Sequence, residues 1–117
     1  MGKSLNKVIV IGHVGRAPEM RYMPSGRPVA SFGVSTTRSW TDEEDQRHEE
    51  TEWFNIVAWG PLAEQCKRML CENDQVYVEG RLQTRSWRTK DESVRFRTEL
   101  VANEMILLHG SMEAGAA

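Results

Sequence analysis

Long apolar runs are missing from the sequence, and cysteine is scarce. The aliphatic run at 8–11 is only four residues long, whereas a membrane-spanning helix needs about 18 apolar residues. Cysteine occurs only at Cys66 and Cys71, too few for a disulfide framework, which predicts a reducing compartment. Cysteine and histidine pairs at the spacing of zinc ligands are also lacking. We therefore expect no metal and no cofactor.

Motifs for catalysis are equally sparse. The glycines around His13 lack the pattern of a nucleotide-binding loop. Neither His13 nor His109 has a serine, aspartate or cysteine at a spacing that would indicate a catalytic pair. The acids around His48 could be imagined as a divalent-metal site of a nuclease, but such a site needs carboxylates that converge from rigid elements. Here the acids fall in a predicted polar loop, where charged residues are usually solvated. An enzyme is therefore not expected.

A large net charge is absent too, but the charge is unevenly distributed. The net charge is −2, yet residues 42–52 contain seven acids and one base. Residues 81–97 contain six bases and only two acids, Asp91 and Glu92. A basic patch on a nearly neutral chain is typical of a phosphate-binding surface. A solvated hairpin with ordinary surface charge is the alternative interpretation.

The apolar pattern predicts a single all-β domain. Residue alternation and β-branched residues predict strands at 8–11, 19–23, 29–37, 51–60, 75–87, 94–100 and 99–108, with a polar loop at 41–50. Pro61 suits the first turn of a helix, and an apolar stripe follows at Leu62, Cys66, Met69 and Leu70. Five main strands with one helix between the third and fourth are the order of an oligonucleotide/oligosaccharide-binding (OB) Greek-key barrel. We expect this domain at 1–110, with an extended hairpin between the last two strands and a short disordered tail at 111–117.

The four tryptophans lie in or beside the predicted strands. Trp53 and Trp59 are six residues apart, so both project from one face of a strand, opposite the aliphatic face. Trp87 lies among arginines and shares its parity with Arg81 and Arg85. Aromatic rings interleaved with arginines can stack bases beside a phosphate path, and they suit single strands because duplex bases already stack. The alternative is that the rings fill the barrel or a subunit interface.

Several sequence blocks carry a family resemblance. The blocks are Leu5-Asn6-Lys7-Val8, Pro18-Glu19-Met20-Arg21-Tyr22, Thr51-Glu52-Trp53, Gly60-Pro61-Leu62-Ala63-Glu64 and Gln75-Val76-Tyr77-Val78-Glu79-Gly80-Arg81-Leu82. In this order and spacing they resemble the bacterial single-stranded DNA-binding protein (SSB) family over residues 3–108. The resemblance implies a homotetramer that binds single-stranded DNA without sequence preference in replication, recombination and repair. It also implies a cytoplasmic, nucleoid-associated protein.

The resemblance assigns roles residue by residue. It implies base stacking at Trp40, Trp53 and Trp87, and Trp59 falls where the family often has a stacking phenylalanine. Basic positions along the DNA path match Lys3, Lys7, Arg21, Arg85 and Arg95. Subunit contacts are implied near Tyr22, Phe54 and Tyr77, and the doubly aliphatic strand adds Val8 and Val10.

The sequence also departs from the family pattern. Asn55, Pro61, Glu72 and Ser86 stand where members often carry a base, and we expect Arg81, Arg88 and Arg97 to substitute for the lost charge. No acidic tip of the kind that recruits replication and repair partners is present in the 117 residues, so we expect weak recruitment of such partners. The acids at 42–45 could also compete with DNA for the basic surface. An SSB-like module that mainly binds replication proteins, or a mitochondrial, phage or plasmid relative, remains open.

Overall fold

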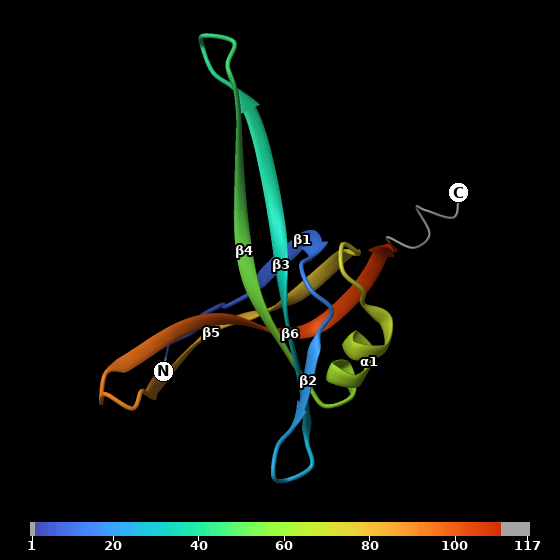
Figure 1. Cartoon of the computed structure of the whole chain (residues 1–117), viewed down its shortest axis with the longest axis vertical. Helices are drawn as coiled ribbons and strands as arrows, with labels where there is room; N and C mark the ends of the chain where they lie inside the picture. The colour runs from blue at the N-terminus through green and yellow to red at the C-terminus, as the bar shows by residue number, and fades with distance from the viewer. Residues whose placement is uncertain (1, 111–117) are drawn as a thin grey trace.

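A computed structural model describes residues 2–110 of the chain (Figure 1). The predicted disordered tail at 111–117 lies outside the described residues. In chain order the elements are β1 (Val8–Val14), β2 (Glu19–Tyr22), β3 (Pro28–Thr41), β4 (Arg47–Trp59), α1 (Pro61–Met69), β5 (Gln75–Arg88) and β6 (Val94–His109). Within the described residues, no helix has the length and apolar character needed to cross a membrane.

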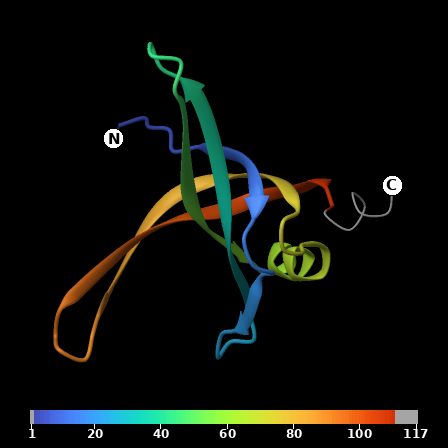
Figure 2. The ribbon, with the colours of Figure 1, turned by 45° about the horizontal axis from the view of Figure 1, so that its top comes forward.

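The strands close into a barrel. Their order is β1-β5-β6-β4-β3-β2, and a further antiparallel pairing of β1 with β3 closes β1, β5, β6, β4 and β3 into a ring. β4 and β6 run parallel at Ile56↔Leu100 and Val57↔Val101, while the other pairings are antiparallel. Figure 2 shows the crossing strands of the barrel with the helix at one end. The closed barrel of five main strands with α1 between β4 and β5 confirms the predicted OB fold.

The barrel core follows the predicted period of two. β1 alternates between buried and exposed residues along its length, with Val10 and Val14 inside and Ile9 and Ile11 outside. The strand therefore has an exposed aliphatic face in addition to its buried one. The strands approach closely at Gly80, where a Cβ would lie 2.0 Å from the carbonyl oxygen of Val101. The absence of a side chain there allows β5 and β6 to pair across the barrel.

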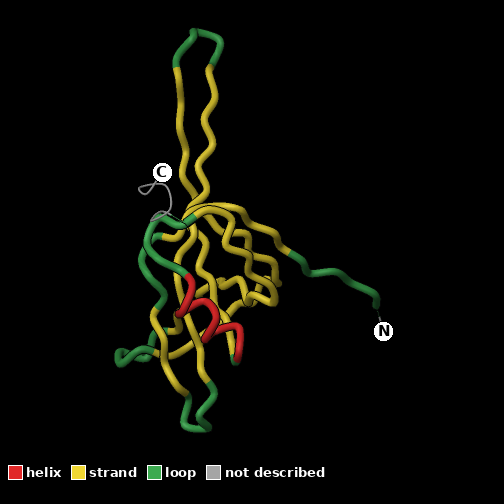
Figure 3. Tube along the Cα trace, turned by 90° about the vertical axis from the view of Figure 1, so that its right-hand side faces the viewer, coloured by secondary structure: helices red, strands yellow, loops and turns green. Residues whose placement is uncertain are grey.

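The helix covers one end of the barrel (Figure 3). Pro61 occupies its first turn, as predicted, and Ala63 and Cys66 are buried against the strands. The helix ends at Met69, earlier than the sequence pattern suggests. Met69 is exposed, whereas Leu70 at the C-cap is buried, so the apolar stripe continues through the cap residue.

Two long hairpins extend from the barrel (Figures 1 and 2). The β3–β4 arm comprises residues 37–51, and the β5–β6 arm comprises residues 81–98. The predicted polar loop at 41–50 is wrong, because β3 runs to Thr41 and β4 begins at Arg47. Cross-strand pairs such as Arg38 with Glu50, at 2.9 Å, let this charged segment form a ribbon instead of a loop.

Candidate nucleic-acid interface

A groove runs along the outer face of β4. Trp53, Asn55, Val57 and Trp59 all line it, as the even spacing of the two tryptophans predicts. Strand alternation places these four side chains on one face, opposite Ala58 in the barrel core. The groove has a volume of about 590 Å³ and is also bounded by the ends of β1 and β2 and by β5 and β6.

The Trp53 ring packs against two glycines. A Cβ at Gly15 would lie 2.8 Å from Cζ3 of the indole, and a Cβ at Gly33 would lie 3.4 Å from Cε3. The backbone N–H of Gly15 donates to the Gly33 carbonyl at 2.9 Å, which holds the two glycines together. The ring therefore lies against backbone while its side chain remains 60% exposed. A ring held in this way offers a surface to a base at little cost in side-chain entropy.

Trp59 lies at the other end of the groove. The Arg27 guanidinium lies over its ring, 4.8 Å from the centroid. A cation over an indole is attracted by the electron density of the ring. The sequence analysis did not identify Arg27, because it belongs to no basic cluster in the chain. Val29 on β3 is paired with Trp59 on β4, and this pairing brings Arg27, two residues before Val29, close to the Trp59 ring.

The groove contains charges of both signs. Arg97 on β6 donates from Nη2 to Oδ1 of Asn55 on β4 at 2.7 Å. Arg97 thus places a guanidinium beside the position where the family often has a base. Arg85 lies 3.7 Å from the largely buried carboxylate of Glu99. The charged residues that line the groove are Arg16, Arg21, Arg85, Arg97, Glu19, Glu72 and Glu99. Sequence clustering missed Arg16, because it stands alone at the end of β1.

The β5–β6 arm has a basic face. Arg85 is directly opposite Arg97, and Trp87 is directly opposite Arg95, so all four side chains share one face of the ribbon. The Arg85 guanidinium carbon is 5.5 Å from the centroid of the Trp87 ring. Arg81 has the same parity along β5 and donates to Gln83, a residue of the groove, at 3.2 Å. We call Arg81, Arg85, Trp87, Arg95 and Arg97 the basic face; it continues directly into the groove.

Arg88 does not belong to the basic face. It follows Trp87 in β5 and is paired with Val94, so its side chain projects from the opposite side of the arm. That side also carries Phe96 and Leu82, which are exposed. Of the three arginines predicted to replace the lost charge, Arg81 and Arg97 therefore face the groove side, whereas Arg88 projects from the opposite side of the arm.

Trp40 is separated from the other tryptophans. It lies near the tip of the β3–β4 arm, opposite His48, whereas Trp53 lies opposite Ser35. The two indoles have opposite parity across the ribbon and so project from opposite faces. The four tryptophans therefore do not form one continuous surface. Trp53 and Trp59 line the groove, Trp87 extends it along the basic face, and Trp40 occupies a different face of the other arm.

The N-terminal segment is attached to β5 through Asn6. The Asn6 side chain exchanges two hydrogen bonds with the backbone of Leu82, at 2.8 and 3.0 Å. Lys7 lies 3.8 Å from Glu79, outside the groove. Lys3 is exposed on the same segment. Neither lysine lines the groove, so their predicted phosphate contacts stay a prediction.

The residues predicted at subunit contacts differ in exposure. Val10 is part of the barrel core, so its side chain does not face the surface where a subunit contact is predicted. Val8 and Phe54 are partly buried and pack against that core. Tyr22 is exposed, and Tyr77 donates its hydroxyl to Glu79 at 2.9 Å. This hydrogen bond raises the pKa of Tyr77.

The described part of the chain contains no metal site. Within residues 2–110, no three histidine, cysteine, aspartate or glutamate side chains gather into a site for a metal ion. Cys66 is buried in the core, and this burial raises the pKa of its thiol to about 11. A thiol in that state is a poor nucleophile, and Cys66 serves the packing of the helix.

An OB barrel with tryptophans and arginines along one groove defines a class of nucleic-acid-binding domain. A profile of the Single-strand binding protein family matches residues 5–108. The chain belongs to this family. It is 48% identical over 110 residues to a single-stranded DNA-binding protein of Neisseria meningitidis serogroup B, covering 94% of this chain and 63% of that one. It is 44% identical over 116 residues to single-stranded DNA-binding protein 1 of Chlorobaculum tepidum, covering 98% of this chain and 71% of that one.

A solved structure gives the same fold. The SSB of Plasmodium falciparum, in complex with single-stranded DNA, superposes with a TM-score of 0.84 at 31% identity. The match covers 92% of this chain and 98% of that one. The chain spans somewhat less than two thirds of the length of the Neisseria relative.

Proposed function

We propose that this chain binds single-stranded DNA independently of sequence, that the groove and the basic face form the main part of its binding surface, and that Trp40 on the β3–β4 arm is a separate stacking site. The observation that carries the proposal is the pair Trp53 and Trp59 on one face of β4, with Arg85 and Arg97 beside them. Indole rings can stack on any base, and each stacked base contributes roughly 1–3 kcal/mol. Guanidinium groups bind phosphates and release counterions. The family membership and the DNA-bound Plasmodium relative support the same conclusion.

The mechanism that we infer is sequestration without covalent chemistry. Bases that are stacked on indoles cannot pair with a complementary strand, so the bound strand is kept from reannealing and from forming hairpins. A protein that sequesters single strands in this way would act in DNA replication, recombination and repair. Its proposed location is the cytoplasm, at the nucleoid. The second candidate, a module that mainly docks replication proteins, would leave the tryptophans of the groove without a ligand.

The test is a titration of tryptophan fluorescence with a long oligothymidine, with duplex DNA as the control. Strong quenching by the single strand alone is expected, because stacking on a base quenches the indole. A folded protein that shows no quenching at low salt would contradict the proposal and favour the protein-docking alternative.

The salt dependence of binding should distinguish the two sides of the β5–β6 arm. We expect Arg97→Ala to reduce the slope of log affinity against log salt by about 0.7, the value for one phosphate contact with a single strand. Arg88→Ala is the matched control, because Arg88 projects from the opposite side of the same arm. Equal effects of the two substitutions would show that the basic face does not define the phosphate path.

We also propose that the chain forms a homotetramer with 222 symmetry. The outer face of the β1-β5-β6 sheet carries a row in which Ile11 is paired with Tyr77 and Tyr77 with Ile106. Ile9 and Ile11 are each 52% exposed in the single chain. Apolar side chains that are exposed together in this way favour burial against another subunit.

Light scattering at micromolar concentration should therefore give a tetramer mass. We expect Ile11→Asp to lower this mass, since it places a charge in the contact. The control Val94→Asp changes an exposed valine at the far end of the β5–β6 arm and should keep the tetramer. A monomer mass for the unmodified chain would contradict the proposal.

A further inference from the structure

A row of four side chains lies on one face near the tip of the β3–β4 arm. Arg38 is opposite Glu50, and Trp40 is opposite His48, so all four project from the same face. The His48 and Trp40 rings are stacked, with centroids 5.4 Å apart and planes at 21°. The Arg38 guanidinium carbon lies 4.5 Å from the centroid of the Trp40 ring. Both a cation and an imidazole thus contact the Trp40 ring, and the residue remains 40% exposed.

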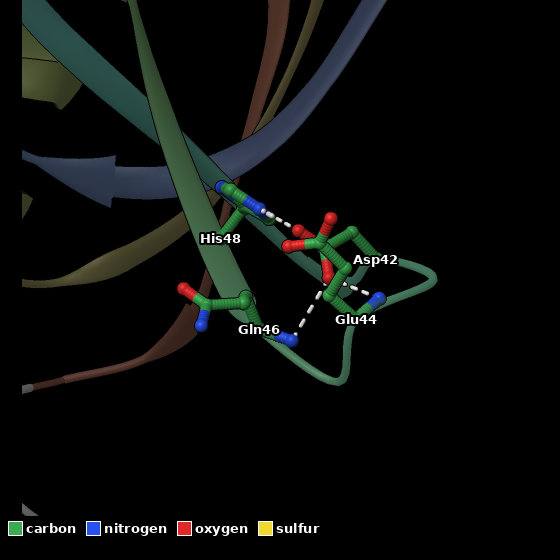
Figure 4. A network of polar contacts seen from close by, with 4 residues as sticks. All are labelled: Asp42, Glu44, Gln46 and His48. Carbon is green, nitrogen blue, oxygen red and sulfur yellow. Dashed lines mark hydrogen bonds and ion pairs between the residues drawn. The ribbon is translucent and has the colours of Figure 1, made fainter.

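Asp42 fixes the imidazole in place (Figure 4). Its Oδ2 lies 2.7 Å from Nε2 of His48, and its Oδ1 accepts the backbone N–H groups of Glu44 and Gln46, each at 2.9 Å. These hydrogen bonds, the one with His48 first, lower the pKa of Asp42. The carboxylate therefore stays charged and immobile in the turn, and the imidazole is held against Trp40.

We propose that Asp42 and His48 position Trp40 for base stacking, and that protonation of His48 strengthens single-stranded DNA binding on this arm. The inference rests on the proposed function, because it concerns how the same ligand is held. His48 is the histidine on this arm, and Trp40 is the aromatic residue that it contacts.

The direction of the pH effect follows from the charges around the imidazole. Asp42 and Arg38 face His48 from the β3 side, Glu50 from its own strand, and Glu44 from the turn. Arg38 is paired with Glu50 at 2.9 Å, which offsets its repulsion of an imidazolium. Protonation turns the His48–Asp42 contact into a charge-assisted pair and removes one net negative charge from the tip.

Bound DNA adds to this effect. A phosphate chain that passes Trp40 attracts the imidazolium more strongly than the neutral ring, so protonation of His48 and DNA binding favour one another. Affinity therefore increases as the pH falls. Histidine is the side chain that titrates between about pH 5 and 8.

The experiment compares the affinity for a fluorescein-labelled oligothymidine at about pH 5.5 and about pH 8, at constant ionic strength. We expect the unmodified chain to bind about three- to tenfold more tightly at the lower pH, which corresponds to the gain from one partly coupled proton. His48→Phe keeps a ring against Trp40 but cannot take up a proton. Its affinity should therefore be about the same at the two pH values.

Two further variants separate positioning from general folding effects. Asp42→Asn removes the charge that holds the imidazole and should also reduce the gain. His13→Gln is the matched control, because His13 lies on β1, opposite Gln75 and away from the tip, and it should keep the gain. Calorimetry in buffers of different ionisation enthalpy should show proton uptake that His48→Phe diminishes.

Each outcome decides between the two proposals. A full gain in His48→Phe, or its loss in His13→Gln, overturns the inference. Binding by the unmodified chain with equal affinity at both pH values also overturns it, while the proposed function stands. An absence of binding at both pH values contradicts the proposed function itself.

Discussion

Trp53→Ala should weaken binding of single-stranded DNA by between about 5-fold and 150-fold. This range corresponds to the roughly 1–3 kcal/mol lost when one aromatic ring no longer stacks on a base. Trp53 is expected to lie at the upper end, because its ring already packs against Gly15 and Gly33 before DNA arrives. Fluorescence anisotropy of a labelled oligothymidine measures the change without relying on the removed indole.

The matched control is Phe96→Ala. Phe96 is 70% exposed on the same β5–β6 ribbon that carries the basic face, but it projects from the opposite side. Its removal deletes an aromatic ring of similar exposure and should leave the affinity within about twofold, since it stacks on no base in the proposed path. Comparable losses in the two variants would contradict the groove as the binding surface and would place DNA on both sides of the arm.

Gly80→Ala should destabilise the fold by about 3 kcal/mol, the upper part of the usual range for overpacking. The added Cβ would lie 2.0 Å from the carbonyl oxygen of Val101 and 2.8 Å from Cδ2 of Leu100. Because the nearest atom is backbone, no rotamer change relieves the contact, and β5 must move away from β6. Denaturant unfolding at a fixed protein concentration measures the loss, since assembly makes stability depend on concentration.

Gly33→Ala is the control for the loss of a strand glycine. A Cβ at Gly33 would have its nearest neighbour at 3.4 Å, a carbon of the Trp53 ring, which can shift slightly. Its stability should change by less than about 1 kcal/mol, because alanine restricts the unfolded chain and fits the native strand. If the two variants unfold at the same denaturant concentration, the close approach at Gly80 does not limit the packing of β5 on β6.

Much of the fold could be predicted from the chain because local patterns and barrel geometry agree. The alternation in β4 separates Trp53 and Trp59 from the buried Ile56, and this alternation is a local property of a strand. Pro61 marked the start of the helix for an equally local reason. The acids of the segment 41–50 predict a loop, but the segment forms part of a β-ribbon. Cross-strand pairing of β3 with β4 stabilises this ribbon, and a local charge pattern does not reveal it.

The binding surface needed the tertiary structure. By itself, the sequence determined which residues face into or out of each strand, and which segments are acidic or basic. Only the folded barrel decided that Arg97 reaches Asn55, that Gly15 supports Trp53, and that Arg88 and Trp40 face elsewhere. The physical reason is register: alternation gives the face of a residue within its own strand, but the partner opposite it depends on how distant strands pair and close.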